Sequence, residues 1–349
     1  MAKIGVIAFS EKGKLLGSFL LHRLEEEGHS VQGYVPGKYA GEKMEAFTDF
    51  HQISGTLFEE KDIVIFIGAC GIAVRAIAPY IKNKMEDPGV LVLDECGKYV
   101  ISLLSGHVGG ANEFARRVGK MVGAEPVITT ATDRNGLFAV DDWAVKNSLH
   151  IWEPASVKEI SSRILAGEKV GFLSHIPVKG NLPGQLTMEH AEAGIAVCYD
   201  RDGQYFPITC RLVPMDLVVG MGCRRGKSYA ELDSFLHLVF QERGLETERI
   251  GLLCSIDVKG KEEGLQKLAK AFRVGLQTFS ASELSKAAGN FTASAFVEKQ
   301  VGVDNVCERS ASLGSGGGRR LVAKQTGDGM TLAVYQREVI LQFSETDRA

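Results

Sequence analysis

The sequence has no apolar run long enough to span a membrane, and its positive and negative charges nearly balance. The formal net charge at pH 7 is -3 over 349 residues. A helix needs about 20 consecutive apolar residues to cross a bilayer, and general binding to nucleic acid usually requires a positive surface. We therefore expect no membrane span and no nucleic-acid partner. Met1 to Lys3 leads directly into a predicted strand, without the layout of a signal peptide.

Paired cysteine motifs are also lacking. The seven cysteines are scattered, their number is odd, and no two of them have the CxxC spacing. Zinc sites and disulfide frameworks normally show regular cysteine spacing. We therefore expect no metal site in the protein and no disulfide scaffold. Free cysteines are typical of a reducing compartment, so we predict a cytoplasmic location.

Neither a Walker motif nor a dinucleotide fingerprint occurs. We interpret Gly13 to Gly17 as a turn after the first strand, but it lacks the glycine spacing of a phosphate-binding loop and has no Ser or Thr after its lysine. This absence argues against a nucleotide-dependent α/β enzyme, which remains one alternative for the chain.

What the sequence does contain is an alternation of apolar strands with amphipathic helices. It predicts an α/β fold of several domains, in which two α/β domains with mainly parallel sheets flank a small mixed middle domain. The predicted domains are residues 1–134, 135–215 and 216–349. Capping boxes, in which a serine and a glutamate three residues later close a helix start, are expected at Ser156–Glu159, Ser228–Glu231 and Ser280–Glu283.

The rest of the first domain is organised around one stretch, Ser105 to Glu113, with the sequence SGHVGGANE. It follows a predicted strand, Val100 to Leu104, and precedes a predicted helix. We interpret it as a strand-to-helix turn at the carboxyl end of a parallel strand, where open α/β sheets place their ligands. The first amides of a helix lack partners within it and the helix dipole is positive there, so this end favours an anion.

Four side chains of this turn are candidates for catalysis. His107 titrates near neutral pH and can accept and return a proton, although it can equally serve only to hydrogen-bond the turn. Ser105 is a candidate nucleophile or a turn hydroxyl, since SGH is not the nucleophile elbow of hydrolases. Asn112 is in position to donate to an oxyanion. Glu113 is either a participant or a residue that complements the helix dipole.

Further candidates for ligand binding surround the turn. The amides of Gly109 and Gly110 can donate to an anion where glycine keeps the backbone accessible. Asp94 and Glu95 end a neighbouring strand and either face the same crevice or are solvated loop acids. Arg75 lies in the predicted helix after Gly71.

A second glycine-rich turn, Gly220 to Ser228, opens the third domain and carries Arg224 and Arg225. Arginine forks bind carboxylates and phosphates in bidentate geometry, so this pair indicates an anionic ligand; two solvated surface arginines are the alternative. Cys223 is either a reactive thiol or a small buried filler. Three polar residues past a later strand either form a polar site or an exposed edge: Ser255, Asp257 and Lys259.

These residues resemble the CbiG family of cobalamin biosynthesis, the cobalt-precorrin-5A hydrolases, over nearly the whole chain. The most specific match is the run from Leu104 to Asn112. The other matching motifs are Gly71 to Arg75, Asp87-Pro88, Asp94-Glu95, Gly220 to Gly226, Ser255 to Lys259, Phe279 to Leu284 and Lys324-Gln325. Arg75 and Gly222 join the substrate-binding set because they lie in these motifs.

The resemblance implies a place in the anaerobic, early-cobalt route to vitamin B12. The substrate would be a cobalt-bearing macrocycle with a δ-lactone on ring A, which the enzyme opens with water, releasing acetaldehyde and giving cobalt-precorrin-5B. The cobalt would belong to the substrate, so no cofactor is expected. The acetate and propionate side chains of the macrocycle would explain paired arginines in an acidic protein.

One rival interpretation is a non-catalytic carrier of corrinoid intermediates, which needs the arginines but no base. A homodimer and transient contacts with neighbouring pathway enzymes are left open by the sequence.

Overall fold

The computed structural model describes residues 2–83, 86–106, 108–130, 137–294, 298–299 and 301–344. The chain divides into two compact units, residues 1–142 and 143–348, which we describe separately. Helix α6 (Val140–Lys146) crosses the division. The predicted boundary at residues 134–135 lies outside the described residues. The predicted boundary at 215–216 lies within the second unit, which contains a sheet on either side of it.

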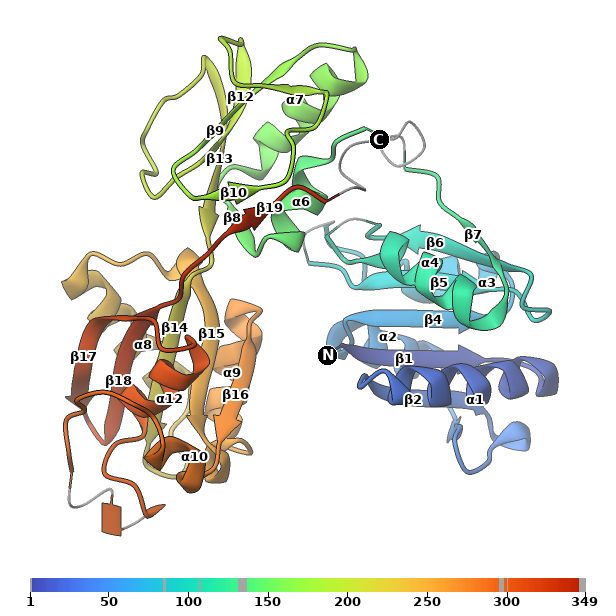
Figure 1. The fold of residues 1–349 in the computed structure, drawn as a ribbon. Helices are drawn as coiled ribbons and strands as arrows, with labels where there is room; N and C mark the ends of the chain where they lie inside the picture. Colours follow the sequence, from blue (N-terminus) through green and yellow to red (C-terminus); the bar gives the residue numbers. More distant parts are fainter. Residues whose placement is uncertain are drawn as a thin grey trace. The chain divides into compact units, whose positions relative to one another are not determined.

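The first unit is built on one seven-stranded sheet with the strand order β3-β2-β1-β4-β5-β6-β7 (Figure 1). Its strands are β1 (Lys3–Ala8), β2 (Ser30–Pro36), β3 (Glu45–Phe47), β4 (Ile63–Ile67), β5 (Gly89–Leu93), β6 (Tyr99–Leu104) and β7 (Glu125–Val127). β4 and β5 are buried along their whole length, as their continuous apolar sequences predict for central strands.

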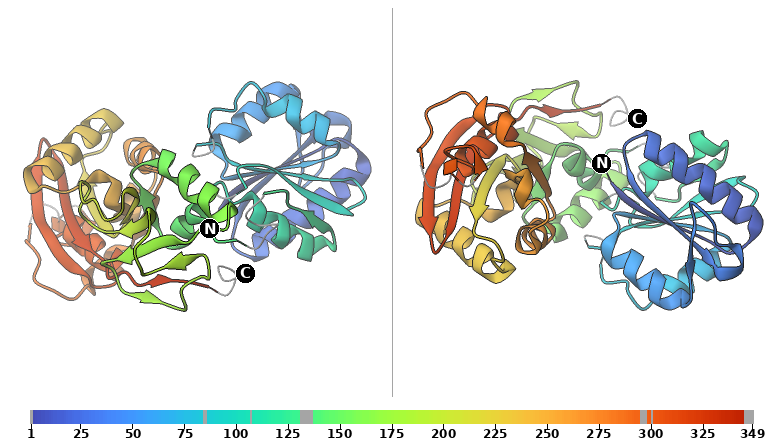
Figure 2. Two further views of the ribbon diagram at one scale, coloured as in Figure 1. Left: turned by 90° about the horizontal axis from the view of Figure 1, so that it is seen from above. Right: turned by 90° about the horizontal axis from the view of Figure 1, so that it is seen from below.

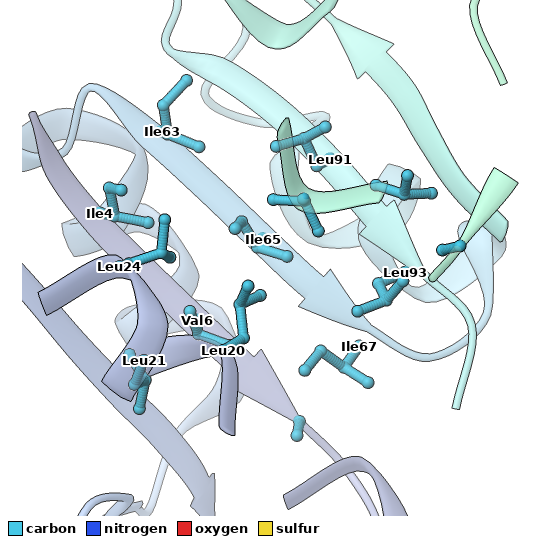
Figure 3. Packing of buried hydrophobic residues seen from close by; sticks show 14 of the residues in the cluster. Ile4, Val6, Leu20, Leu21, Leu24, Ile63, Ile65, Ile67, Leu91 and Leu93 are labelled. Atoms are coloured by element: carbon cyan, nitrogen blue, oxygen red, sulfur yellow. The ribbon is translucent and has the colours of Figure 1, made fainter. Parts of the chain in front are cut away.

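Two helical layers cover the two faces of this sheet (Figure 2). The helices are α1 (Glu11–Glu26), α2 (Phe50–Glu60), α3 (Cys70–Ile77) and α4 (Ala111–Val122). α1 and α4 pack on one face, where Leu20 and Leu24 meet Ile4, Val6 and Ile65 (Figure 3). α2 and α3 pack on the other face. The unit is therefore a three-layer α/β/α structure.

The direction of β6 differs from the expectation. β1 to β5 are parallel to one another, but β6 is antiparallel to β5, with Val90 opposite Leu104. β7 is parallel to β6. The carboxyl end of β6 therefore lies at the edge of the sheet where β1, β4 and β5 begin. The prediction that Asp94 and Glu95 share a crevice with the Ser105–Glu113 turn is wrong, because they follow β5 at the opposite edge.

The second unit contains a five-stranded sheet with the order β11-β9-β12-β13-β8, in which only β8 is antiparallel to its neighbour. Its elements are β8 (Leu149–Ile151), α7 (Pro154–Leu165), β9 (Val170–Ser174), β11 (Leu186–Thr187), β12 (Ala193–Val197) and β13 (Ile208–Pro214). The middle segment, predicted to be small and mixed, thus forms a mixed sheet that is mainly parallel.

The second sheet of this unit has the order β16-β15-β14-β18-β17. β14, β15 and β16 are parallel, β18 is antiparallel to β14, and β17 is antiparallel to β18. α8 and α9 cover one face, and α12 lies against the other face. The elements are β14 (Leu217–Cys223), α8 (Tyr229–Arg243), β15 (Ile250–Ile256), α9 (Glu263–Phe272), β16 (Gly275–Phe279), α10 (Ala281–Ser285), α12 (Cys307–Gly314), β17 (Arg319–Gly327) and β18 (Met330–Gln336). Short 3-10 helices occur at Gly37–Tyr39, Thr247–Arg249 and Asp257–Lys259.

The segment after β18 returns to the part of the second unit that precedes residue 215. β19 (Leu341–Gln342) pairs with β10 (Val178–Lys179) in a two-stranded sheet. The indole of Trp143 donates to the carbonyl of Gln342 at 2.9 Å and stacks on Phe343. This return holds the residues on either side of position 215 in one unit.

Two of the predicted capping boxes are confirmed, Ser228–Glu231 and Ser280–Glu283. The third is wrong, because α7 begins at Pro154, a residue suited to a first helical turn, and the Ser156 hydroxyl donates to the Glu153 carbonyl. Gly13 to Gly17 is likewise not a turn. It lies inside α1, where a Cβ on Gly17 would lie 3.2 Å from the Met44 methyl, so glycine permits close packing of the helix.

Candidate functional site

The turn after β6 closes on itself before α4 begins. The amide of Ala111 donates to the Ser105 carbonyl at 3.2 Å, and the amide of Asn112 donates to the Gly106 carbonyl at 2.9 Å. Gly110 precedes the helix in the left-handed conformation, with φ 75°. Two of the first helical amides are therefore used within the turn, and no described residue accepts a bond from the amides of Gly109 and Gly110.

Backbone segments approach one another closely at this turn. A Cβ on Gly109 would lie 2.4 Å from the Cβ of Ser105, and a Cβ on Gly89 would lie 2.4 Å from the carbonyl oxygen of Gly109. No side chain fits at either position without displacing the other segment. The glycines thus let the start of β5 pack directly against the turn.

Asn112 has a structural partner that the sequence analysis did not identify. Its side-chain amide is 4% exposed and donates from Nδ2 to Oγ1 of Thr130 at 2.8 Å. A Cβ on Gly106 would lie 2.7 Å from Oδ1 of Asn112. Asn112 therefore ties the turn to the segment after β7. The local sequence around Thr130 carries no signal of this contact.

The other candidates of the turn differ in accessibility. Ser105 has φ 54°, a left-handed conformation that is rare for serine. Its Oγ is buried, and no hydrogen-bond partner for it occurs among the described residues. Glu113 is exposed in the first turn of α4. His107 lies outside the described residues.

At the opposite edge of the sheet, Asp94 organises the hairpin between β5 and β6. Its carboxylate accepts from the amides of Cys96, Lys98 and Tyr99 at 2.9, 2.8 and 2.5 Å. Burial alone would raise the pKa of Asp94, but these amides lower it overall. Arg75 is exposed at the same edge, and its Nη1 donates a hydrogen bond to the carbonyl of Gly71 at 3.3 Å.

In the second unit, the cationic candidates meet where β14 and β15 end. Arg224 and Arg225 are exposed, and within the described ranges neither guanidinium takes part in an ion pair. The amide of Arg224 donates to the Gly329 carbonyl at 2.9 Å. Its side-chain stem crosses Gly329, where a Cβ would lie 2.7 Å from Cδ of Arg224.

Lys227 and Lys259 add two positive charges to this group, and both are paired with acids. Lys227 is paired with Glu231 and Asp328, both at 2.7 Å. Glu262 binds the ammonium of Lys259 at 2.8 Å and accepts from the Gly226 amide. We name the group of Arg224, Arg225, Lys227 and Lys259 the cationic edge. Lys227 and Glu262 are not among the residues predicted for this site, although Lys227 follows the arginines in the same glycine turn.

The remaining candidates near the cationic edge divide by burial. Ser255 is fully buried and donates from its hydroxyl to the Met221 carbonyl at 2.7 Å, so it acts in packing β15 against β14. Asp257 is exposed and accepts from the amide of Val258. Thr331 donates to the Gly222 carbonyl at 3.4 Å. Burial raises the pKa of Cys223, although Lys259 and Lys227 oppose this, so its thiol is a neutral filler.

Metal ligands do not gather anywhere in the described part of the chain, where no group of three or more His, Cys, Asp or Glu side chains is arranged to hold an ion. Among the same residues, no helix is both long and apolar enough to cross a membrane.

The fold and these sites define a multi-domain α/β protein whose candidate residues lie in loops at strand ends. Residues 52–133 match the family model for the cobalamin synthesis G N-terminal region, and residues 217–335 match that for the cobalamin synthesis G C-terminus. The chain belongs to the CbiG family of cobalamin biosynthesis proteins.

Curated relatives cover most of the chain. A cobalt-precorrin-5A hydrolase of Salmonella typhimurium is 34% identical over 86% of this chain and 86% of its own length. A cobalt-precorrin-5A hydrolase of Priestia megaterium is 33% identical over 80% of this chain and 79% of its own. The crystal structure of a cobalamin biosynthesis protein G homologue from Sulfolobus solfataricus is 24% identical, covering 96% of this chain and 97% of that one with a TM-score of 0.45.

Proposed function

We propose that this chain is a cobalt-precorrin-5A hydrolase of anaerobic cobalamin biosynthesis. It opens the ring A δ-lactone with water and releases acetaldehyde, giving cobalt-precorrin-5B. The observation that carries this proposal is the 34% identity to a relative of that name over 86% of both chains. A non-catalytic carrier is not favoured, since the curated relatives are named as hydrolases.

The reaction needs a base and donors to an oxyanion. Water attacks the lactone carbonyl, a base takes its proton, and the tetrahedral oxyanion collapses to a carboxylate and a free alcohol. Removal of the alcohol proton then forms the carbonyl of acetaldehyde and breaks the adjacent carbon–carbon bond, whose electron pair passes to the macrocycle. We assign the proton transfers to His107. The amides of Gly109 and Gly110 are the best donors, because those of Ala111 and Asn112 already bind carbonyls of the turn.

The other residues of the turn support this assignment in different ways. Because its amide already donates to Thr130, we assign Asn112 a role in positioning the turn. Ser105 holds an unusual backbone conformation two residues before His107 in the sequence, and we assign it a role in shaping the turn. Glu113 is exposed in the first turn of α4, and we assign it the role of stabilising the imidazolium form by its negative charge.

The cationic edge accounts for recognition of the acid side chains of the macrocycle. The guanidinium groups of Arg224 and Arg225 have no carboxylate partners among the described residues. Each can bind one carboxylate in bidentate geometry. Lys259 and Asp257 flank them, and Gly222 keeps β14 close to Thr331. Arg75 and Asp94 lie at the edge of the first sheet opposite the turn after β6, so we assign them no contact in this reaction. Ser255 contributes only through packing.

The proposal requires no cofactor, since cobalt arrives with the substrate. A homodimer, contacts with pathway enzymes and a cytoplasmic location remain predictions of the sequence.

The test is the release of acetaldehyde from cobalt-precorrin-5A by the full-length protein. His107→Ala should lower the rate at least a hundredfold, because general acid–base catalysis typically contributes that much. His22→Ala, an exposed histidine on α1, serves as the matched control. Binding of the substrate without acetaldehyde would show a carrier. An unchanged rate in the His107 variant would remove the imidazole from the mechanism.

A further inference from the structure

A hollow of about 550 Å³ lies at the other end of the sheet from the cationic edge. Its walls include Tyr199, Arg319, Gln336 and Arg337. Gln336 pairs with Leu217, the first residue of β14, whereas Arg224 follows the last residue of that seven-residue strand. At about 3.3 Å per residue, the two places are about 20 Å apart. The hollow is therefore a separate site.

The polar side of this hollow is positively charged. Within the described ranges, neither Arg319 nor Arg337 has a carboxylate within ion-pairing distance. Arg319 uses Nη2 to bind Oε1 of Gln336 at 2.8 Å. Arg337 uses Nη2 to bind the Met215 carbonyl at 2.6 Å. Each guanidinium keeps further donors for a ligand, because arginine has five. Glu338, exposed at the rim, is the one acid among the lining residues.

A fully buried carboxylate holds these groups in place. Asp216 is 0% exposed. It binds Arg249 at 3.0 Å and accepts from Nε2 of Gln336 at 2.7 Å and from the hydroxyl of Tyr199 at 2.8 Å. The amide of Gln336 is thereby oriented with its oxygen toward Arg319, so the guanidinium is fixed before a ligand arrives. Such preorganisation reduces the entropy lost on binding.

The remaining walls are apolar. Ile176, Pro177 and Val339 line the hollow, and Tyr199 remains 38% exposed although its hydroxyl is engaged. Burial and the nearby charge of Asp216 raise the pKa of Tyr199 to about 12, so the phenol is neutral and does not repel an anion. The volume falls within the range of small-molecule sites.

We propose that this hollow is a second ligand site, which binds a carboxylate carried on a flat apolar body through Arg319 and Arg337. The carboxylate is either an acid side chain of a tetrapyrrole or a free organic acid. The site does not depend on the hydrolase reaction, and acetaldehyde release is not a readout for it.

The test is calorimetric titration of the full-length protein with 1-naphthoate, with the neutral 1-naphthamide as the matched ligand. We expect naphthoate to bind and the amide to bind at least tenfold more weakly. Arg319→Gln and, separately, Arg337→Gln should each weaken naphthoate binding about tenfold, the cost of one charged hydrogen-bonding partner. Arg243→Gln, an exposed arginine on α8 with the same loss of charge, should bind like the parent protein.

A competition arm identifies the source of the carboxylate. Displacement of naphthoate by coproporphyrin III, a tetracarboxylate tetrapyrrole, would assign the site to tetrapyrrole side chains, and its failure to compete would assign the site to free acids. The proposal is overturned if the parent protein binds no naphthoate, or if Arg319→Gln and Arg337→Gln bind it as tightly as Arg243→Gln does.

Discussion

Nδ2 of Asn112 and Oγ1 of Thr130 lie 2.8 Å apart in a hydrogen bond that joins the first turn of α4 to the segment after β7. The two residues belong to the one part of the first unit in which strands run opposite to β1 to β5. Because β6 and β7 are parallel, both segments leave the sheet at the same edge. The bond therefore fixes the glycine turn against its own βαβ unit.

Thr130→Val keeps the shape of the side chain but removes the acceptor for Asn112. Loss of one hydrogen bond from the buried amide of Asn112 costs about 1–2 kcal/mol. We therefore expect the free energy of unfolding, measured by urea denaturation, to fall by that amount. If the turn holds the catalytic base, the rate constant for acetaldehyde release should fall about tenfold with little change in KM. Thr130→Ser restores the hydroxyl and should restore both quantities. Equal effects of the two variants would show that the bond has no role.

The aliphatic part of the Arg224 side chain passes directly over Gly329, which lies in the turn between β17 and β18. Gly329→Ala would place a Cβ 2.7 Å from Cδ of that arginine, and the residue has φ 73°. We expect KM for the macrocycle to rise roughly three- to tenfold as Arg224 is displaced, with about 1 kcal/mol of backbone strain. Gly244→Ala is the control, because Gly244 has φ 60° and nothing lies within 4 Å of its Cβ position. It should show the strain without the change in KM.

Glu308 is a fully buried acid whose carboxylate has both hydrogen-bond donors and an ion-pair partner. It accepts from the amides of Thr292 and Lys324 and binds Arg320 at 3.2 Å. Burial alone would raise the pKa of Glu308, but these partners lower it overall below its ordinary value of 4.5. The folded state then binds fewer protons than the unfolded state, so this stabilisation is present above about pH 4.5 and is lost as pH falls through the lower, folded pKa.

Glu308→Gln should therefore lower the free energy of unfolding at pH 7 by about 2 kcal/mol. Its stability should also decline less steeply than that of the parent protein below pH 4.5. Glu263→Gln removes an acid from an exposed pair with Lys267 and should change stability much less. Parallel pH profiles for the parent protein and the Glu308 variant would contradict the assignment.

Much of the local structure could be predicted from the sequence. The serine and glutamate at positions 228 and 231 form the expected capping box, because both hydrogen bonds of that motif are made within one turn. Strand β4, Ile63–Ile67, is central and buried, as its continuous apolar sequence indicates. The glycine turn before α4 also lies where the spacing of apolar residues places it.

The direction of β6 was missed, although a signal was present. Only Asp94 to Lys98 separate β5 from β6, whereas parallel neighbours need a connection of about a dozen residues or more. That short connection is a hairpin held by Asp94, and it moves the turn to the other edge of the sheet.

The sequence by itself determined the α/β class, the two glycine turns and the residues able to carry charge or a proton, because these depend on side-chain chemistry and on periodicity along a few turns of chain. Only the tertiary structure decided which of them meet. It separated Asp94 from the turn after β6, paired Asn112 with Thr130, and linked Arg319 to Asp216 through Gln336. Contacts between residues distant in sequence depend on how elements pack across the sheet, which local patterns do not encode.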